Sequence, residues 1–233
     1  MRAGVRAWAL GQAVAVASPD LNRRDRLTVR GDADEVSALV RLLLPRLGPS
    51  YRLMGEQALV AEVAARLPQV GPPHAFEWME TGGPPASGEV GEVGGVDQVG
   101  GSGGRSVPAG WLVGAEQEVG ALLAQASPSS WAVPGLPGVR RWAGLRVPGG
   151  ALVATAADAW SCPQVGFVAG VATAVAHRGR GYGQAVCAFV FAALAAEHGR
   201  VALVVDTVNL GAIALYERLG MRGRRVAAAV LDQ

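Results

Sequence analysis

Hydrophobic residues change their spacing several times along the first eighty residues. The run Leu27-Thr28-Val29 is typical of a short strand, whereas the apolar positions that follow recur every three or four residues, as on one face of a helix: Val36, Leu39, Val40, Leu43 and Leu44. Asp32 or Asp34 can cap this helix, and Pro45 ends it. The pattern then repeats and predicts strands over 51–54 and 75–79 around a helix over 57–67. These elements indicate an α/β half.

Glycine dominates the next stretch, TGGPPASGEVGEVGGVDQVGGSGGRSVP, from Thr81 to Pro108. No regular element could repay the entropy of ordering so many glycines. The sequence therefore predicts a linker over 81–108, which separates an N-terminal half, residues 1–80, from a C-terminal domain, residues 109–233.

The C-terminal domain again alternates strands with helices. We expect helices over 116–125, 182–198 and about 210–219. Strands are expected over 111–113, 141–147, 151–157, 165–175, 201–205 and 224–231, with Pro148-Gly149-Gly150 as a hairpin turn.

Composition excludes several classes of protein. Charged residues make up 17% of the chain and the formal net charge is +2, which speaks against a nucleic-acid partner. Two cysteines and three histidines show no metal-ligand spacing, so we expect no metal and reduced thiols, as in the cytoplasm. The apolar run 185–196 is too short to span a bilayer, and no membrane partner is expected.

The first residues allow two interpretations. Arg2 and Arg6 precede an Ala/Val-rich stretch that ends in AVAS and imitates a signal-peptide cleavage site. Gly11 and Gln12 interrupt that stretch, and the alternation through Trp8, Leu10, Val14 and Val16 favours an edge strand.

The stretch VATAVAHRGRGYGQAV, residues 171–186, places a Gly/Arg turn between a strand and a helix. The first N–H groups of a helix have no acceptor within it, and glycines at 179, 181 and 183 let an anion approach them. Arg178 and Arg180 add guanidinium donors, which suits a diphosphate. A tight bend of purely steric origin is the alternative. The chain has no Lys, so this is no Walker loop, and the spacing fits a dinucleotide fingerprint poorly.

A second stretch, VVDTVNLGAIALYERLGM at 204–221, carries the spacing Asn209, Ala212, Tyr216, Gly220. Together the two stretches resemble the GNAT superfamily of acyl-CoA-dependent N-acyltransferases. The resemblance implies the α/β (α+β) GNAT fold, a mixed twisted sheet flanked by helices. The N-terminal half fits a reduced GNAT-like domain, as in the glycine N-acyltransferase-like branch with two related halves.

The resemblance also implies a site for acetyl-CoA as co-substrate. Arg178, Gly179, Arg180, Gly181, Tyr182 and Gly183 would wrap the pyrophosphate, backbone donors contributing more than side chains. Backbone groups of Thr173, Ala174 and Val175 would pair with the pantetheine arm, as an added strand does. Asn209 would contact the coenzyme or, equally, cap the helix that it precedes.

By the same resemblance, Tyr216 is the general acid that protonates the leaving thiolate, with a packed aromatic as the alternative. An amine acceptor must also lose a proton, yet the strand VGFVAGVATAV contains no acid. Asp206 and Asp158 are the candidate bases, and a water that relays to a backbone carbonyl would serve as well.

The leading hypothesis is an N-acetyltransferase that transfers an acetyl group from acetyl-CoA to a primary amine by direct attack in a ternary complex. A GNAT-fold module that binds acyl-CoA without turnover is the alternative, and a nucleotide-binding protein is a third. The acceptor stays open between a small amine, an amino acid and the amine of a peptide, as does the choice between monomer and homodimer.

Overall fold

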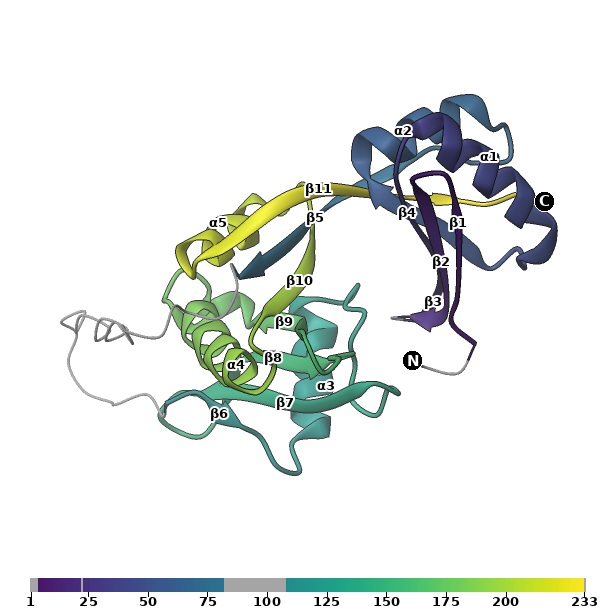
Figure 1. Ribbon diagram of the computed structural model, residues 1–233. Helices are drawn as coiled ribbons and strands as arrows, with labels where there is room; N and C mark the ends of the chain where they lie inside the picture. Colours follow the sequence, from purple (N-terminus) through teal and green to yellow (C-terminus); the bar gives the residue numbers. More distant parts are fainter. Residues whose placement is uncertain (1–3, 22, 82–107, 233) are drawn as a thin grey trace. The chain divides into compact units, whose positions relative to one another are not determined.

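The computed structural model describes residues 4–21, 23–81 and 108–232 (Figure 1). The predicted linker over 81–108 lies outside the described residues, apart from its two end positions. The chain divides into two compact units, which are treated separately below: unit 1 comprises 1–78, 204–213 and 223–233, and unit 2 comprises 79–203 and 214–222.

Unit 1 is a mixed sheet with two helices that contact each other. Its strands are β1 (Arg6–Leu10), β2 (Ala13–Leu21), β3 (Arg24–Arg30), β4 (Tyr51–Glu56) and most of β11 (Met221–Val230). The pairs β1–β2, β2–β3 and β4–β11 are antiparallel, and β3–β4 is parallel. Its helices are α1 (Ala33–Leu43), which continues into the 3-10 turn η1 (Leu44–Arg46), and α2 (Gln57–Arg66).

Local signals explain the helices of unit 1. Asp32 caps α1, its carboxylate accepting the N–H groups of Asp34 at 2.8 Å and Glu35 at 3.4 Å. Helix α1 gives way to η1 beside Pro45, as predicted. The edge strand that the alternation favours is confirmed, since β1 ends the strand order and pairs with β2. Ala13, Ala15 and Ala17 are buried, whereas Leu10 and Val14 are exposed.

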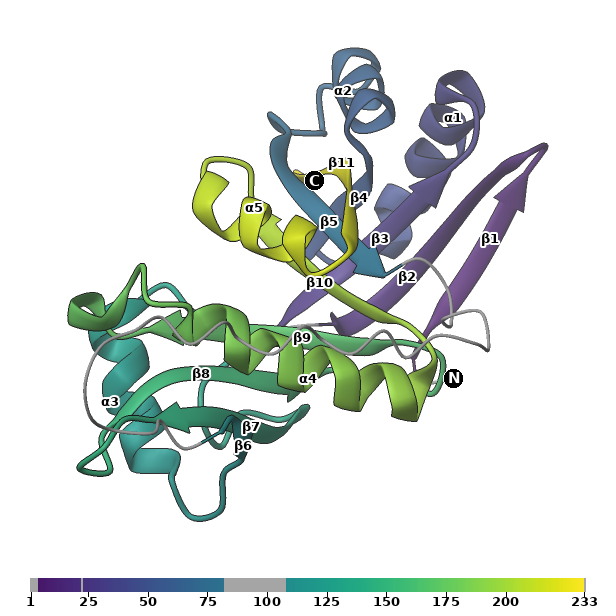
Figure 2. The same cartoon turned by 90° about the vertical axis from the view of Figure 1, so that its left-hand side faces the viewer.

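Unit 2 also combines antiparallel and parallel strand pairs. Strands β6 (Gly110–Trp111), β7 (Val139–Arg146), β8 (Leu152–Ala159) and β9 (Gly166–Thr173) form antiparallel pairs, and the start of β10 (Val201–Asp206) runs parallel to β9. Helices α3 (Glu116–Ala126) and α4 (Tyr182–His198) cover opposite faces of this sheet (Figures 1 and 2). The 3-10 turn η2 (Val175–His177) joins β9 to the turn that precedes α4. The predicted mixed sheet flanked by helices is thus confirmed.

Four elements divide between the units: β5 (His74–Thr81), α5 (Leu210–Arg218), β10 and β11. The sequence placed all residues beyond the linker in one domain. Residues 223–233 instead belong to unit 1, because β11 pairs with β4 from Val226↔Glu56 to Val230↔Arg52. Hydrophobic periodicity indicates that a strand exists but not which strand it pairs with. The assignment of residues 223–233 to unit 1 could therefore not be predicted from the sequence. None of the helices in the described part of the chain is long and apolar enough to cross a membrane.

A bulge shapes β9 near its middle. Thr155 pairs with Ala172 and Ala157 with Ala169, so Gly170 and Val171 together face the single residue Ala156. Gly170 has φ +62°, and a Cβ added there would lie 2.5 Å from Cη2 of Trp142. Glycine is required at this position for both its backbone conformation and the closeness of the indole ring.

Replacing Gly170 with Ala is expected to lower the free energy of unfolding by about 2–4 kcal/mol, since left-handed strain adds to the clash with Trp142. Gly149→Ala is the matched control. Its φ is +95° but no atom lies within 4 Å of an added Cβ, so only about 1 kcal/mol should be lost. Urea denaturation of both variants measures the difference, and equal losses would contradict the packing argument.

Candidate coenzyme site

The turn between β9 and α4 holds two glycines in the left-handed region. Gly179 has φ +72° and Gly181, the residue that caps α4, has φ +78°. An added Cβ on either would meet no atom within 4 Å, so the space above the turn is open. At Gly183 an added Cβ would lie 2.8 Å from Oγ1 of Thr173, so this glycine lets α4 approach the end of β9. Glycine is therefore favoured at 179 and 181 by the backbone conformation and at 183 by close packing.

The backbone N–H groups from Gly179 to Gln184 point to no acceptor within the described parts of the chain. The first intrahelical bond of α4 at this end runs from the N–H of Ala185 to the carbonyl of Gly181 at 2.9 Å. A row of unpaired donors at a helix start, with the positive end of the helix dipole behind it, is a site for an anion.

The two arginines of the turn are used differently. Arg178 donates from its guanidinium to the carbonyl of Ala126, the last residue of α3, at 2.9 Å and to the carbonyl of Thr173 at 3.3 Å. It ties the end of α3 to the end of β9. Arg180 is exposed and makes no hydrogen bond or ion pair with any described residue, so its guanidinium is available to an anion. The sequence analysis had assigned both arginines to the pyrophosphate.

Strand β9 is paired along one edge and little along the other. It pairs with β8 from Asp158↔Val168 to Ala154↔Thr173. With β10 its register has two pairs, Val201↔Gly166 and Ala202↔Phe167, among the residues described. The backbone groups of β9 on this second edge are thus left for another extended chain.

The strand ends two residues earlier than predicted. Thr173 is its last residue, while Ala174 precedes η2 and Val175 lies in it. The N–H of Ala174 donates to the carbonyl of Val153 at 2.8 Å, and the carbonyl of Ala174 accepts the N–H of His177 at 2.8 Å. Both backbone groups of Ala174 are therefore satisfied within the protein.

Asp206 and Asn209 lie in unit 1 and are both exposed. Asp206 ends β10, and its carboxylate accepts the N–H of Val208 at 3.2 Å. The side-chain oxygen of Asn209 accepts the N–H of Ala212 at 3.2 Å at the start of α5, which is the capping role that the sequence allowed.

Tyr216 lies in unit 2 on the second half of α5 and is buried, 6% exposed. Its ring is 6.2 Å from that of Phe191 on α4. Burial, with a smaller effect from the Cys187 thiol, raises the pKa of the Tyr216 phenol well above its ordinary value. The phenol therefore keeps its proton at neutral pH.

Asp158, one of the two candidate bases, is completely buried and fully occupied by partners. Its carboxylate lies 3.2 Å from Nε of Arg141 and 3.6 Å from Nη1 of Arg140, and it accepts the hydroxyl of Ser161 at 2.5 Å. Arg141 also pairs with Glu197 of α4 and lies 3.9 Å from the centre of the Trp111 ring. This network joins β7, β8 and α4, so Asp158 is a structural carboxylate.

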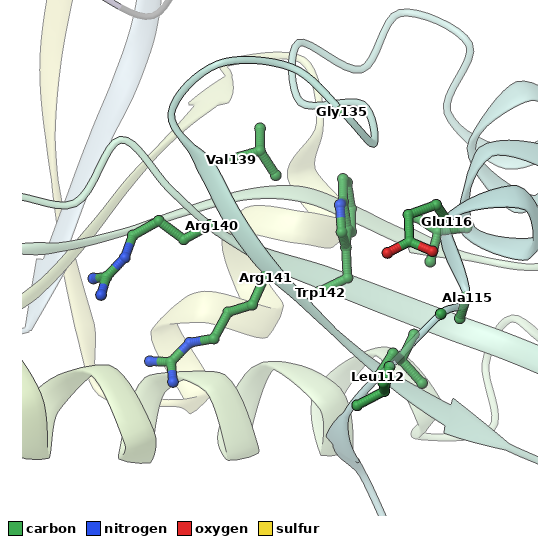
Figure 3. A pocket seen from close by; sticks show the side chains of 11 residues that line it. Leu112, Ala115, Glu116, Gly135, Val139, Arg140, Arg141 and Trp142 are labelled. Atoms are coloured by element: carbon green, nitrogen blue, oxygen red, sulfur yellow. The ribbon is translucent and has the colours of Figure 1, made fainter.

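A cavity of about 290 Å³ opens beside the start of α3 (Figure 3). Its wall comes from three segments: Leu112–Glu116 with Val119, the loop residue Gly135, and the start of β7 from Val139 to Trp142. Trp142 contacts both the hydrophobic core and the cavity. It serves both, since it is 7% exposed, packs with Val119 and Leu123, and also lines the cavity.

Residues 137–221 match the sequence model of the acetyltransferase (GNAT) family. The match takes in the turn at 178–183, Tyr216 and the last glycine of the second motif. No curated protein sequence matches the chain.

Solved structures with the same fold cover nearly the whole chain. A GCN5-related N-acetyltransferase from Kribbella flavida has 19% identity and a TM-score of 0.59 over 98% of this chain and 90% of its own. One from Sphaerobacter thermophilus has 20% identity and a TM-score of 0.57 over 95% and 81%. A GNAT-family protein from Novosphingobium aromaticivorans has 22% identity and a TM-score of 0.53 over 97% and 91%. At these identities the likeness establishes the fold.

Asp158→Asn is expected to lower the free energy of unfolding by about 2 kcal/mol, because two guanidinium groups lose their shared counter-charge while staying in part exposed to water. Asp206→Asn is the matched control for stability, since Asn still offers an oxygen to the N–H of Val208. Urea denaturation should show no loss for the control. An unchanged stability in Asp158→Asn would contradict the structural role of this carboxylate.

Proposed function

We propose that this protein is an acyltransferase that transfers an acetyl group from acetyl-CoA to a primary amine by direct attack in a ternary complex. The observation that carries the proposal is the row of unpaired N–H groups from Gly179 to Gln184, which follows directly on a strand with one little-paired edge. The family of residues 137–221 supports the same reading. A cytoplasmic location and an acceptor that is a small amine or a peptide amine belong to this proposal.

The chain's own residues fit the coenzyme in two places. The turn can receive a pyrophosphate on neutral main-chain donors, with Arg180 as an additional cation. The free edge of β9 up to Thr173 can pair with the amide-rich pantetheine arm, and Val175 lies exposed just beyond it. Because Ala174 has satisfied backbone groups, it is assigned a contact role only. When bound, acetyl-CoA supplies a thioester as the electrophile.

Two side chains are proposed to move the protons. Tyr216 holds its proton at neutral pH and donates it to the leaving sulfur. Asp206 is the proposed base, since its carboxylate is exposed while Asp158 is occupied by two arginines. A water molecule that relays the proton to a backbone carbonyl is the alternative base. We also propose that Asn209 contacts the coenzyme. Its side-chain oxygen accepts the N–H of Ala212, and its amide N–H₂ group can still donate to the coenzyme.

An acyl-CoA-binding module without turnover is the second candidate. The observation that favours it is that β9 carries no acid and that the nearby Asp158 is unavailable as a base. Coenzyme binding alone cannot separate the two candidates, so one variant must test the turn and another must test the chemistry.

Gly181→Ala tests the turn. A methyl group at this left-handed position would intrude on the open space above the N–H groups, and we expect acetyl-CoA affinity to fall about ten-fold, the equivalent of one main-chain hydrogen bond. Gly199→Ala is the matched control, because Gly199 ends the same helix with φ +75° and equally open surroundings. Calorimetric titration with acetyl-CoA measures both. Equal affinities for the two variants would remove the turn from the coenzyme site.

Tyr216→Phe tests the chemistry. Loss of the hydroxyl should lower kcat about 10²–10⁴-fold while acetyl-CoA affinity stays within a factor of about two, because a positioned proton donor acts in the transition state. Tyr51→Phe, which removes a hydroxyl from a buried tyrosine of unit 1, is the control. Thiol release from acetyl-CoA in a pool of amines provides the rate.

The same assay reports on the base. Asp206→Asn should lower kcat with stability preserved if Asp206 takes the proton, and an unchanged rate would favour the relaying water. Acetyl-CoA binding to the wild-type protein without thiol release in any amine pool would support the binding module and overturn the enzyme.

A further inference from the structure

The cavity beside α3 lies outside the turn and the free edge of β9. Its lining combines the apolar side chains of Leu112, Ala115, Val119 and Val139 with polar groups of the main chain and of a few side chains. A volume of about 290 Å³ suits a small molecule rather than a macromolecular surface. The ligand class therefore follows from the polar groups that line it.

Glu116 is one of these groups, and its carboxylate has no partner within the described residues. Another glutamate of the same helical turn provides a comparison. Glu118 is held by two hydrogen bonds from Arg146, at 2.6 and 2.8 Å, and this guanidinium lowers the pKa of Glu118 below its ordinary value. Of the two acidic side chains in the first turn of α3, the one on the cavity is the one left unneutralised.

The arginines of the lining do not neutralise Glu116. Arg141 is committed to Asp158 and Glu197, and Arg140 approaches Asp158. In Figure 3 both guanidinium groups extend away from Trp142 and Glu116, whereas the carboxylate of Glu116 is directed toward the ring of Trp142. The charge presented to the cavity is therefore negative.

Trp142 supplies the second polar group. It is 7% exposed, and its indole N–H donates to no described residue. By contrast, the indole N–H of Trp160 donates to the carbonyl of Pro137 at 3.2 Å. A tryptophan N–H normally finds a hydrogen-bond partner, so the unpaired one on this cavity wall is available to an acceptor carried by a ligand.

We propose that this cavity binds a small organic amine as its ammonium ion, with Glu116 as the counter-charge and the Trp142 N–H donating to an ether, hydroxyl or carbonyl oxygen of the same ligand. The apolar walls take the carbon chain between the two groups. A carboxylate-bearing ligand is disfavoured because it would face Glu116.

The proposal that this ligand is the acceptor rests on the proposed acyltransferase function. The link is Trp142, whose ring forms part of the cavity wall and also abuts Gly170 in the bulge of β9. The cavity and the strand proposed to hold the acyl thioester thus share one side chain. An oxygen-bearing small amine is then the expected substrate class, in preference to an amino acid.

Binding is tested by calorimetry on the full chain without acetyl-CoA, using methoxypropylamine, pentylamine and pentanol as probes. Methoxypropylamine should bind most tightly, pentylamine more weakly and pentanol least. Glu116→Gln should weaken both amines about ten-fold through loss of a charge-assisted bond and leave pentanol unchanged. Glu118→Gln is the matched control, because it removes the same charge two residues further along α3. It should change no affinity by more than about two-fold.

Trp142→Phe tests the donor while an aromatic ring is kept. It should remove the advantage of methoxypropylamine over pentylamine without affecting pentylamine itself. If this variant is too unstable to assay, Glu116→Gln decides alone, because Glu116 is exposed and its replacement leaves the core intact. The proposal would be overturned if pentanol bound as tightly as the amines, or if the affinities for the amines were the same in Glu116→Gln as in the wild type.

Two outcomes separate this site from the acyltransferase activity. Glu116-dependent amine binding in a protein that does not bind acetyl-CoA would overturn the enzyme and leave the ammonium site standing. Acetyl transfer with a KM for the amine that is the same in wild type and Glu116→Gln would retain the enzyme and overturn the cavity as the acceptor pocket.

Discussion

Among the described residues, strand β9 is paired along one edge and little paired along the other, and the bulge at Gly170 lies where the pairing changes. Its start is held on both sides, by Val168 pairing with Asp158 and by Gly166 pairing with Val201. Beyond the bulge, β9 pairs within the described parts of the chain on its β8 edge only. An extra residue in one strand bends that strand and increases its twist, so the end of β9 turns away from the direction of its start. The bend requires a residue that tolerates φ +62° beside an indole ring.

Features built from neighbouring residues were predictable. The limits of α4, the cap by Asp32 and the hairpin at Pro148-Gly149-Gly150 depend on residues a few positions apart. The turn at 178–183 was found for the same reason, since its glycines act through local backbone geometry. Tyr216 could be singled out only through the spacing of the second motif, because one tyrosine on a short helix indicates no function by itself.

Features built from distant residues were not predictable. Arg141 meets Asp158 across 17 positions and Glu197 across 56, and no periodicity links them. The early end of β9 goes with a hydrogen bond from the N–H of Ala174 to the carbonyl of Val153 in the neighbouring strand β8, which the apolar run 165–175 does not reveal. The alternation predicted the edge strand but not which of its side chains are buried, because alanine is small enough to pack between sheet and helix while the larger Val14 stays exposed.

The pairing of β11 with β4 has a consequence for how the protein is made. During synthesis β4 leaves the ribosome long before Val226 and the residues that follow it, which cover its edge in the finished protein. Until then β4 presents unpaired backbone groups to any extended chain nearby, its own or another. Unit 1 begins to form first and is completed last. In the interval between these two events, the edge of β4 is a place where an extended chain can pair wrongly.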